Sequence, residues 1–285
     1  MDKDGLRRLA DDFSKNSPLN RVEGEIALLP ALAGMAMFQA PLLGIASVTD
    51  AFFDELRRPG IVGPHFRLPG DWLPTARTVI SYFLPFADSV VKSNRLDPGL
   101  PSPEWLHARI EGQVFIDALG AHIAEALGKE GWDAVVPSSD ERFWYRRVPA
   151  GLDGDGRPVP GFTSNWSERH VAHVAGLGTF GLSAGLITSR GIAGRFGSVV
   201  TSLPLKADER PYGSFDEYCN YCGACIRRCP PAAISLERRK EHLPCSLYVD
   251  RMREEYRPRY GCGKCQVKVP CERGIPKVGR NAAAR

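Results

Sequence analysis

The chain has 285 residues, of which 43% are hydrophobic, and this composition excludes a disordered chain and predicts one or two packed domains. Its formal net charge is +4, from 37 basic and 33 acidic residues, and so small an excess does not by itself indicate nucleic-acid binding. No secretory signal is seen at the start, and the most apolar stretch, residues 26–48, is interrupted by prolines and glycines. We therefore expect a soluble, cytoplasmic protein without a membrane span.

The first third of the chain predicts one helix and two strands. Residues 6–16 have the pattern of a short amphipathic helix. Residues 42–48 form a short apolar run that predicts a buried strand, and Asp50 is suited to cap a helix that follows it. Residues 78–84 are rich in β-branched and aromatic side chains and end at Pro85, so they predict a second core strand.

The middle of the chain continues this alternation of helices and strands. Helical periodicity is clearest over residues 104–128, where large apolar side chains recur at helical spacing. Residues 132–136 predict a strand, residues 167–175 a helix, and residues 197–203 a last strand. The pattern predicts an α/β core over residues 1–205.

Residues 206–285 contain every cysteine of the chain, together with 17 basic and 10 acidic residues. The run from Cys219 to Pro230 has the spacing C-x2-C-x2-C-x3-C-P, which is typical of bacterial ferredoxins with two iron–sulfur clusters. Zinc is the alternative, but zinc sites usually use two separated C-x2-C pairs. Disulfides would need an oxidising compartment, which no export signal supports. The cysteines that predict two [4Fe–4S] clusters are Cys219, Cys222, Cys225, Cys229, Cys245, Cys262, Cys265 and Cys271.

The second group of cysteines departs from the ferredoxin spacing, because five residues instead of three separate its C-x2-C pair from the last cysteine. By analogy with the crossed ferredoxin arrangement, one cluster is expected on Cys219, Cys222, Cys225 and Cys271, and the other on Cys229, Cys245, Cys262 and Cys265. Four thiolates for each cluster leave no iron open. Another part of the chain should therefore receive the electrons.

Three stretches of the sequence carry a resemblance to a known family: residues 72–82, residues 167–182 with their continuation to 197–205, and residues 260–266. On these stretches the chain resembles the epoxyqueuosine reductases and the related corrinoid-dependent reductive dehalogenases. The second stretch is the most specific, since many ferredoxin-like proteins share the cluster motif.

This resemblance implies a nitroreductase-like core that binds cobalamin without a histidine below the cobalt, followed by a ferredoxin-like domain whose two [4Fe–4S] clusters reduce the cobalt. It implies a low-potential electron donor such as ferredoxin or flavodoxin. The basic C-terminal face could dock such an acidic donor, and it is equally well explained as a solvated surface. It places a cobalamin pocket between the core and the cluster domain. The residues expected to contact the cobalamin are Thr163, Ser164, Asn165, Gly176, Leu177, Gly178, Arg195 and Ser198.

The catalytic residues are less clearly marked. Epoxyqueuosine reductases carry an acidic residue at the position of Thr163, so the expected proton donor is missing here. Candidate donors are His170, and Tyr145 beside a cation, although a core histidine and an aromatic packing residue are the plain alternatives. The run from Gly176 to Gly181 matches G-x-G-x-x-G, but a helix precedes it where a dinucleotide site needs a strand.

Three hypotheses for the function follow. The first is a corrinoid-dependent reductase that acts on a small-molecule or RNA-borne substrate. The second is an electron-transfer or activase protein that reduces the cobalt of a partner corrinoid protein. The third is an epoxyqueuosine reductase acting on tRNA, against which Thr163 argues. The sequence leaves the substrate, the electron donor and the oligomeric state open.

Overall fold

The structure, a computed structural model, describes residues 1–152, 156 and 158–277. The helices are α1 (Lys3–Asn16), α2 (Phe52–Glu55), α3 (Pro69–Trp72), α4 (Asp88–Ser93), α5 (Pro103–Lys129), α6 (Glu168–Val174), α7 (Ala224–Arg227) and α8 (His242–Glu255). The strands are β1 (Leu42–Ser47), β2 (Thr78–Pro85), β3 (Ala134–Val135), β4 (Gly151–Leu152), β5 (Pro158–Val159), β6 (Gly178–Phe180), β7 (Leu186–Thr188), β8 (Gly194–Thr201), β9 (Ile234–Ser235) and β10 (Arg239–Lys240).

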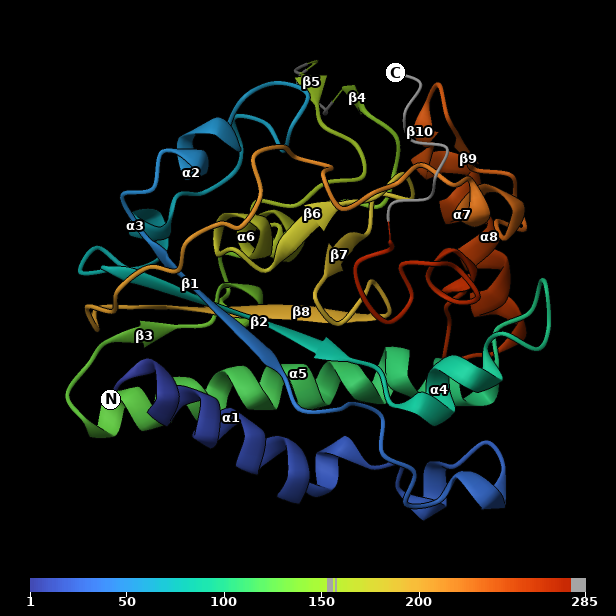
Figure 1. The fold of residues 1–285 in the computed structure, drawn as a ribbon, viewed down its shortest axis with the longest axis horizontal. Coiled ribbons are helices and arrows are strands. Elements are labelled where there is room, and N and C mark those ends of the chain that lie inside the picture. The colour runs from blue at the N-terminus through green and yellow to red at the C-terminus, as the bar shows by residue number, and fades with distance from the viewer. Residues whose placement is uncertain (153–155, 157, 278–285) are drawn as a thin grey trace.

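A four-stranded sheet with the order β1-β2-β8-β3 forms the centre of the molecule (Figure 1). Every pairing in it is antiparallel, and all eight residues of β2 are buried. Successive residues of a strand point to opposite faces, so Ile80 joins one core cluster and Val79 another. The expected α/β class is confirmed as a mixed α/β fold.

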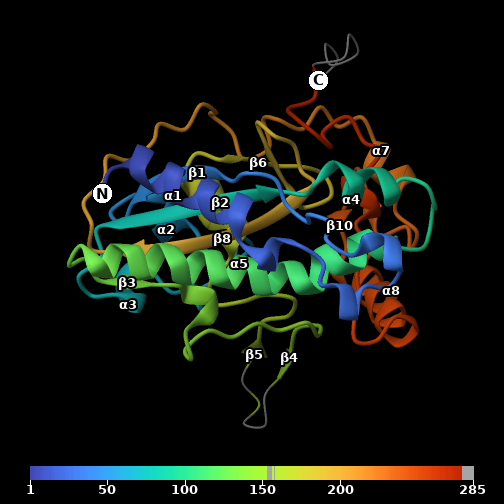
Figure 2. The ribbon, with the colours of Figure 1, turned by 90° about the horizontal axis from the view of Figure 1, so that it is seen from below.

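Helices cover both faces of this sheet (Figures 1 and 2). The long helix α5 lies along one face, and α1 packs against it, so that Phe13 stacks on Phe115. Helix α6 covers the opposite face, where Val171 and Val174 join the second core cluster. Both helices confirm the periodicity predictions for residues 104–128 and 167–175.

The cysteine-rich segment lies at one end of the sheet, coloured orange to red in Figure 1. It packs against the start of α5 and against the β6–β7 hairpin. Hydrogen bonds join it to the core: Tyr248 donates to the carbonyl of Gly99 at 2.8 Å, and the amide of Ile192 donates to that of Cys271 at 2.9 Å. The boundary near residue 205 between two domains stays a prediction. Among the helices of the described residues, none has the length and apolar character needed to cross a membrane.

Candidate functional site

The first set of thiols surrounds a small hollow beneath the β6–β7 hairpin. Cys219, Cys222, Cys225 and Cys271 all line it, together with Ile187, Ile192 and Val269. Cys222 is exposed, whereas the other seven cysteines of the chain are half-buried. Burial raises the pKa of Cys225 and of Cys271 to about 12, so these thiols need a metal to become thiolates at neutral pH.

The second set of thiols lines a different and larger cavity. These thiols belong to Cys229, Cys245, Cys262 and Cys265. The structure thus groups the eight cysteines in the two sets expected from the ferredoxin analogy, although their iron stays a prediction. All eight are free of disulfides. In residues 1–152, 156 and 158–277, no three His, Cys, Asp or Glu side chains converge as ligands of a single metal ion. Each set of thiols instead surrounds a hollow.

The two C-G-x-C turns have the same backbone shape despite the unequal spacing of the cysteines. Gly223 has φ 67° and ψ 6°, and Gly263 has φ 66° and ψ 4°. Each glycine starts a short helical turn, α7 in the first case and the 3-10 turn Lys264–Gln266 in the second. This left-handed conformation favours glycine, and it turns the two cysteines of each pair toward the same hollow.

Core residues hold the second turn in place. Lys264 is fully buried, and its ammonium donates to the backbone carbonyl of Asn94 at 2.9 Å and to the Asn94 side-chain oxygen at 3.1 Å. The Asn94 amide donates in return to the carbonyl of Cys262 at 3.0 Å. Gly263 lies against the ring of Trp105 on α5, where an added Cβ would come within 1.9 Å of the ring. The turn therefore cannot form independently of the core.

The large cavity has a volume of about 1030 Å³, at the upper end of the range for ligand sites. Its walls come from α5, the segment 143–147, the start of α6, β8 and the cysteine-rich segment. Five basic and two acidic residues line its described part, which favours a ligand with negative charge. They are Arg109, Arg147, Arg169, Arg195 and Lys240, with Asp117 and Glu168.

Of the residues expected to contact a cofactor, Ser164 and Arg195 line this cavity. The Arg195 guanidinium donates to the carbonyl of Arg109 at 2.9 Å, and burial lowers its pKa to about 9. The hydroxyl of Thr163 bonds to His65 at 2.9 Å, outside the cavity lining. Asn165 is fully buried, and its side chain donates to the carbonyl of Arg142 at 2.8 Å.

The glycines of the segment 176–178 make close backbone contacts within the fold, and their expected approach to a cofactor stays a prediction. Gly178 pairs with Thr188 in the β6–β7 hairpin, and an added Cβ would lie 2.0 Å from the carbonyl oxygen of Ile187. Gly176 has φ 81° and faces the backbone of Glu209. Leu177 packs in a small cluster with Ala172, and Ser198 accepts a 2.9 Å hydrogen bond from the Trp166 indole. These four residues do not line the cavity.

The two candidate proton donors lie in different places. Tyr145 lines the cavity and is 65% exposed. His170 is not among the lining residues: its ring bonds to the Ser167 hydroxyl at 2.7 Å and lies against Phe180. Burial and the neighbouring Arg169 lower the pKa of His170 to about 3, so its imidazole is neutral near pH 7. Neutral imidazole is a poor acid, and its position argues against a role as donor.

Sequence reasoning missed Glu168, the first residue of α6. It lines the large cavity, and both of its carboxylate oxygens are buried without a hydrogen-bond partner in the described structure. Burial raises the pKa of this carboxyl to about 7. Nothing in its spacing marked it, since an acidic residue in a first helical turn is ordinarily a solvated one.

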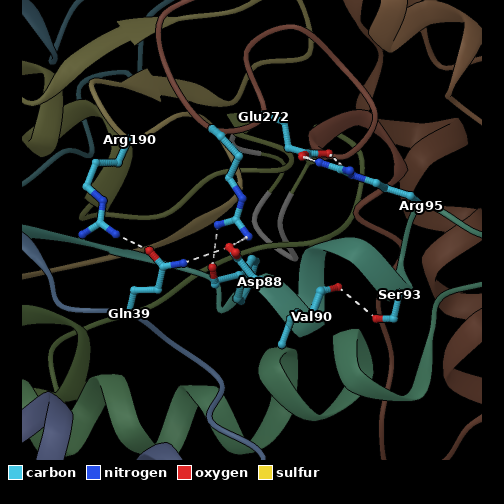
Figure 3. Close-up of polar contacts among 9 residues, drawn as sticks. Gln39, Asp88, Val90, Ser93, Arg95, Arg190 and Glu272 are labelled. Atoms are coloured by element: carbon cyan, nitrogen blue, oxygen red, sulfur yellow. Dashed lines mark hydrogen bonds and ion pairs between the residues drawn. The ribbon is translucent and has the colours of Figure 1, made fainter.

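A basic cleft has several of its lining residues joined by the polar contacts that Figure 3 shows. Arg95 pairs with Glu272, the residue after Cys271, and Arg190 donates to the side chain of Gln39. Lys92 has no ion-pair partner in the part of the chain that the structure describes. The residues lining the cleft are Gln39, Asp88, Lys92, Arg95, Arg190 and Arg273, so its charge is positive.

The fold and the four-and-four grouping of cysteines define a class of protein: a mixed α/β core joined to a cysteine-rich segment. A solved catabolic reductive dehalogenase has the same fold, with a TM-score of 0.50 and 15% sequence identity over 83% of this chain and 30% of its own. No family model matches the chain.

The particular relatives found among curated proteins are epoxyqueuosine reductases. That of Listeria monocytogenes is 30% identical over 122 residues, which is 39% of this chain and 31% of the relative. That of Lactococcus garvieae is 33% identical over 115 residues, 37% of this chain and 32% of the relative. The match spans about a third of the length of these relatives. The predicted resemblance to epoxyqueuosine reductases and reductive dehalogenases is confirmed.

Proposed function

We propose that this protein is an iron–sulfur oxidoreductase that uses two [4Fe–4S] clusters to reduce a corrinoid bound in its large cavity. One observation carries the proposal: the second thiol set lines the same cavity as Arg195 and Glu168 of the core. The proposed clusters would therefore lead from the surface into a ligand site.

The direction of electron flow follows from exposure. The first thiol set includes the exposed Cys222, and the second faces the cavity. A charge on Cys265 of the second set raises the pKa of Cys225 of the first, so the two sets are close neighbours. Electrons would enter at the first cluster and leave through the second.

The residues present fit a corrinoid in the cavity. When bound, a corrinoid supplies a cobalt centre that accepts electrons and acts on the substrate. Arg109, Arg195 and Lys240 can hold its phosphate and amide groups, because guanidinium and ammonium groups donate several hydrogen bonds to such acceptors. Tyr260 and Trp105 provide an aromatic wall that excludes water.

Anaerobic reconstitution with iron, sulfide and hydroxocobalamin tests this proposal. We expect about eight iron atoms and one cobalamin for each chain, since four thiolates hold each cluster. Cys222→Ser should remove chiefly the first cluster and Cys262→Ser chiefly the second, as measured by electron paramagnetic resonance. Zinc in place of iron, a single cluster, or no cobalamin affinity would contradict the proposal. Cobalamin that reconstitutes only on a separate protein would favour the activase hypothesis.

The substrate class can be tested with two probes. The names of the curated relatives favour an epoxide on tRNA. Against this, Thr163, whose hydroxyl bonds to His65, occupies the position where an acidic residue is expected in epoxyqueuosine reductases. A tRNA stem-loop carrying epoxyqueuosine and a brominated phenol should each be incubated with reduced enzyme. Conversion of the stem-loop would assign the tRNA reaction, and bromide release would assign dehalogenation.

A further inference from the structure

We propose that Glu168 is the proton donor of the large cavity, a carboxylic acid that replaces the acid missing at Thr163. The inference rests on the proposed function, because a reduction at carbon consumes a proton as well as electrons. Its starting point is Glu168, a residue of the cavity lining whose two carboxylate oxygens are buried without a partner of good hydrogen-bond geometry in the described residues, with Ser198 and Trp166 beside them.

The surroundings of Glu168 favour the protonated form. An ionised carboxylate that is buried without a partner costs several kcal/mol, so the group takes up a proton instead. The Trp166 indole donates to the Ser198 hydroxyl at 2.9 Å, and both groups lie beside the Glu168 carboxyl and favour its ionised form. Burial is the larger effect, and the pKa is raised to about 7.

Several charged and titratable groups surround Glu168, and they belong to α6 and to the elements packed around it. They are Tyr82 of β2, Asp117 of α5 and Arg195 of β8, with Arg169 and His170 on α6 itself. The negative charge of Asp117 adds to the rise in the Glu168 pKa. Tyr82 donates its own proton to the carbonyl of Ile116 at 2.9 Å, so it does not serve Glu168 as a partner.

A protonated carboxyl carries one O–H donor, and in the described residues that donor has no acceptor. We assign the acceptor role to a substrate that enters the cavity. In the reduction of a substrate R–X, two electrons arrive through the clusters from a low-potential electron-transfer protein. The C–X bond breaks, X leaves with its electron pair, and the carbon takes the proton of Glu168 to give R–H. Glu168 is left as a carboxylate and regains a proton from solvent.

Infrared spectroscopy of the cluster-loaded protein tests the protonation without cobalamin or substrate. We expect a protonated-carboxyl band that disappears with a midpoint near pH 7, is absent in Glu168→Gln, and persists in the surface control Glu125→Gln. Asp117→Asn should leave the band in place, which separates it from the other cavity carboxyl. A band assigned to Glu168 that is already ionised below pH 5 would overturn the proposal.

The cobalamin-loaded protein tests the destination of the proton. The midpoint potential of the bound cobalt should vary with pH between 6 and 8 in the wild type and much less in Glu168→Gln. The two proteins are compared at equal cobalamin occupancy. Equal pH dependence in the two would overturn the donor role. Failure of the wild type to bind cobalamin would overturn the proposed function itself, while the infrared titration still decides the state of Glu168.

Discussion

Hydrogen bonds between Asn94 and the turn around Lys264 connect the core to the cysteine-rich segment. Both side chains are fully buried, and Asn94 accepts hydrogen bonds from Lys264 and from the amide of Ser102 while donating to the carbonyl of Cys262. A buried ammonium is stable only when its donors are satisfied. Asn94 therefore matters to the second thiol set although it is far from it in sequence.

We expect Asn94→Ala to destabilise the cluster-loaded protein by about 3 kcal/mol, because three buried hydrogen bonds are lost and one of them joins a charged group. Anaerobic urea unfolding measures this, with iron content followed in parallel. Ser93→Ala is the matched control, since Ser93 bonds only to Val90 and Ser102 and should cost under about 1 kcal/mol. Equal losses in the two variants would contradict the role given to Asn94.

Glu168 should also make stability depend on pH. Its pKa is raised from 4.5 to about 7 by folding, so the folded state holds a proton that the unfolded state releases between these values. The contribution is fully present below pH 4.5 and is lost as pH rises through 7, by about 3 kcal/mol in all. Thermal unfolding from pH 4.5 to 8 should show this fall in the wild type and a flatter profile in Glu168→Gln. Parallel profiles would show that the carboxyl is ionised at neutral pH.

At the scale of elements, two short turns and one hairpin shape the thiol sites. The C-G-x-C turns are nearly superimposable in φ and ψ, but their neighbours differ. Around Gly223 an added Cβ would meet only side-chain atoms at 3.6 Å or more, whereas around Gly263 it would enter the Trp105 ring. The β6–β7 hairpin borders both sites, since Ile187 lines the hollow of the first set and Leu186 lines the large cavity.

Alanine substitution at Gly223 and at Gly263 should have different effects on stability and iron content. Gly223→Ala should cost about 1–2 kcal/mol, the usual penalty for a left-handed residue with a side chain, and should keep both clusters. Gly263→Ala adds a clash with Trp105 and should lower the iron content to about half. Iron analysis and electron paramagnetic resonance of the two purified variants make the comparison. Similar iron content in both would mean that the Trp105 contact does not position the second turn.

At the scale of the whole molecule, the cysteine-rich segment closes one end of the α/β core and leaves a cavity where they meet. The first thiol set includes the exposed Cys222, and Arg95 of the basic cleft pairs with Glu272 beside Cys271, whereas the second set lines the large cavity. This arrangement suits an acidic electron-donor protein that docks at the cleft. Attraction between opposite charges raises association rates, and salt weakens the effect.

Lys92→Glu should therefore slow reduction of the clusters by ferredoxin or flavodoxin about tenfold at low salt, with a smaller effect at high salt. Reduction by dithionite should be unchanged. Lys129→Glu, at the other end of α5, is the control and should leave both rates as in the wild type. Stopped-flow absorbance measures the rates. An equal loss in both variants would indicate an effect of net charge and not of the cleft.

The sequence by itself determined the local features of this protein. The spacing C-x2-C-x2-C brings three thiols together within one turn, and helical periodicity over residues 104–128 is visible because neighbouring residues share a face. Strands β1 and β2 were likewise predicted from short apolar runs. These properties depend on residues close together in the chain.

Only the tertiary structure decided the rest. The antiparallel sheet order and the pairing of Gly178 with Thr188 depend on contacts between segments that the sequence pattern does not place. From the sequence, Glu168 is an ordinary acidic residue of a first helical turn, and His170 is a candidate proton donor because histidine titrates near neutral pH. The pKa of each group depends on burial and nearby charges, and these come from elements distant in the chain.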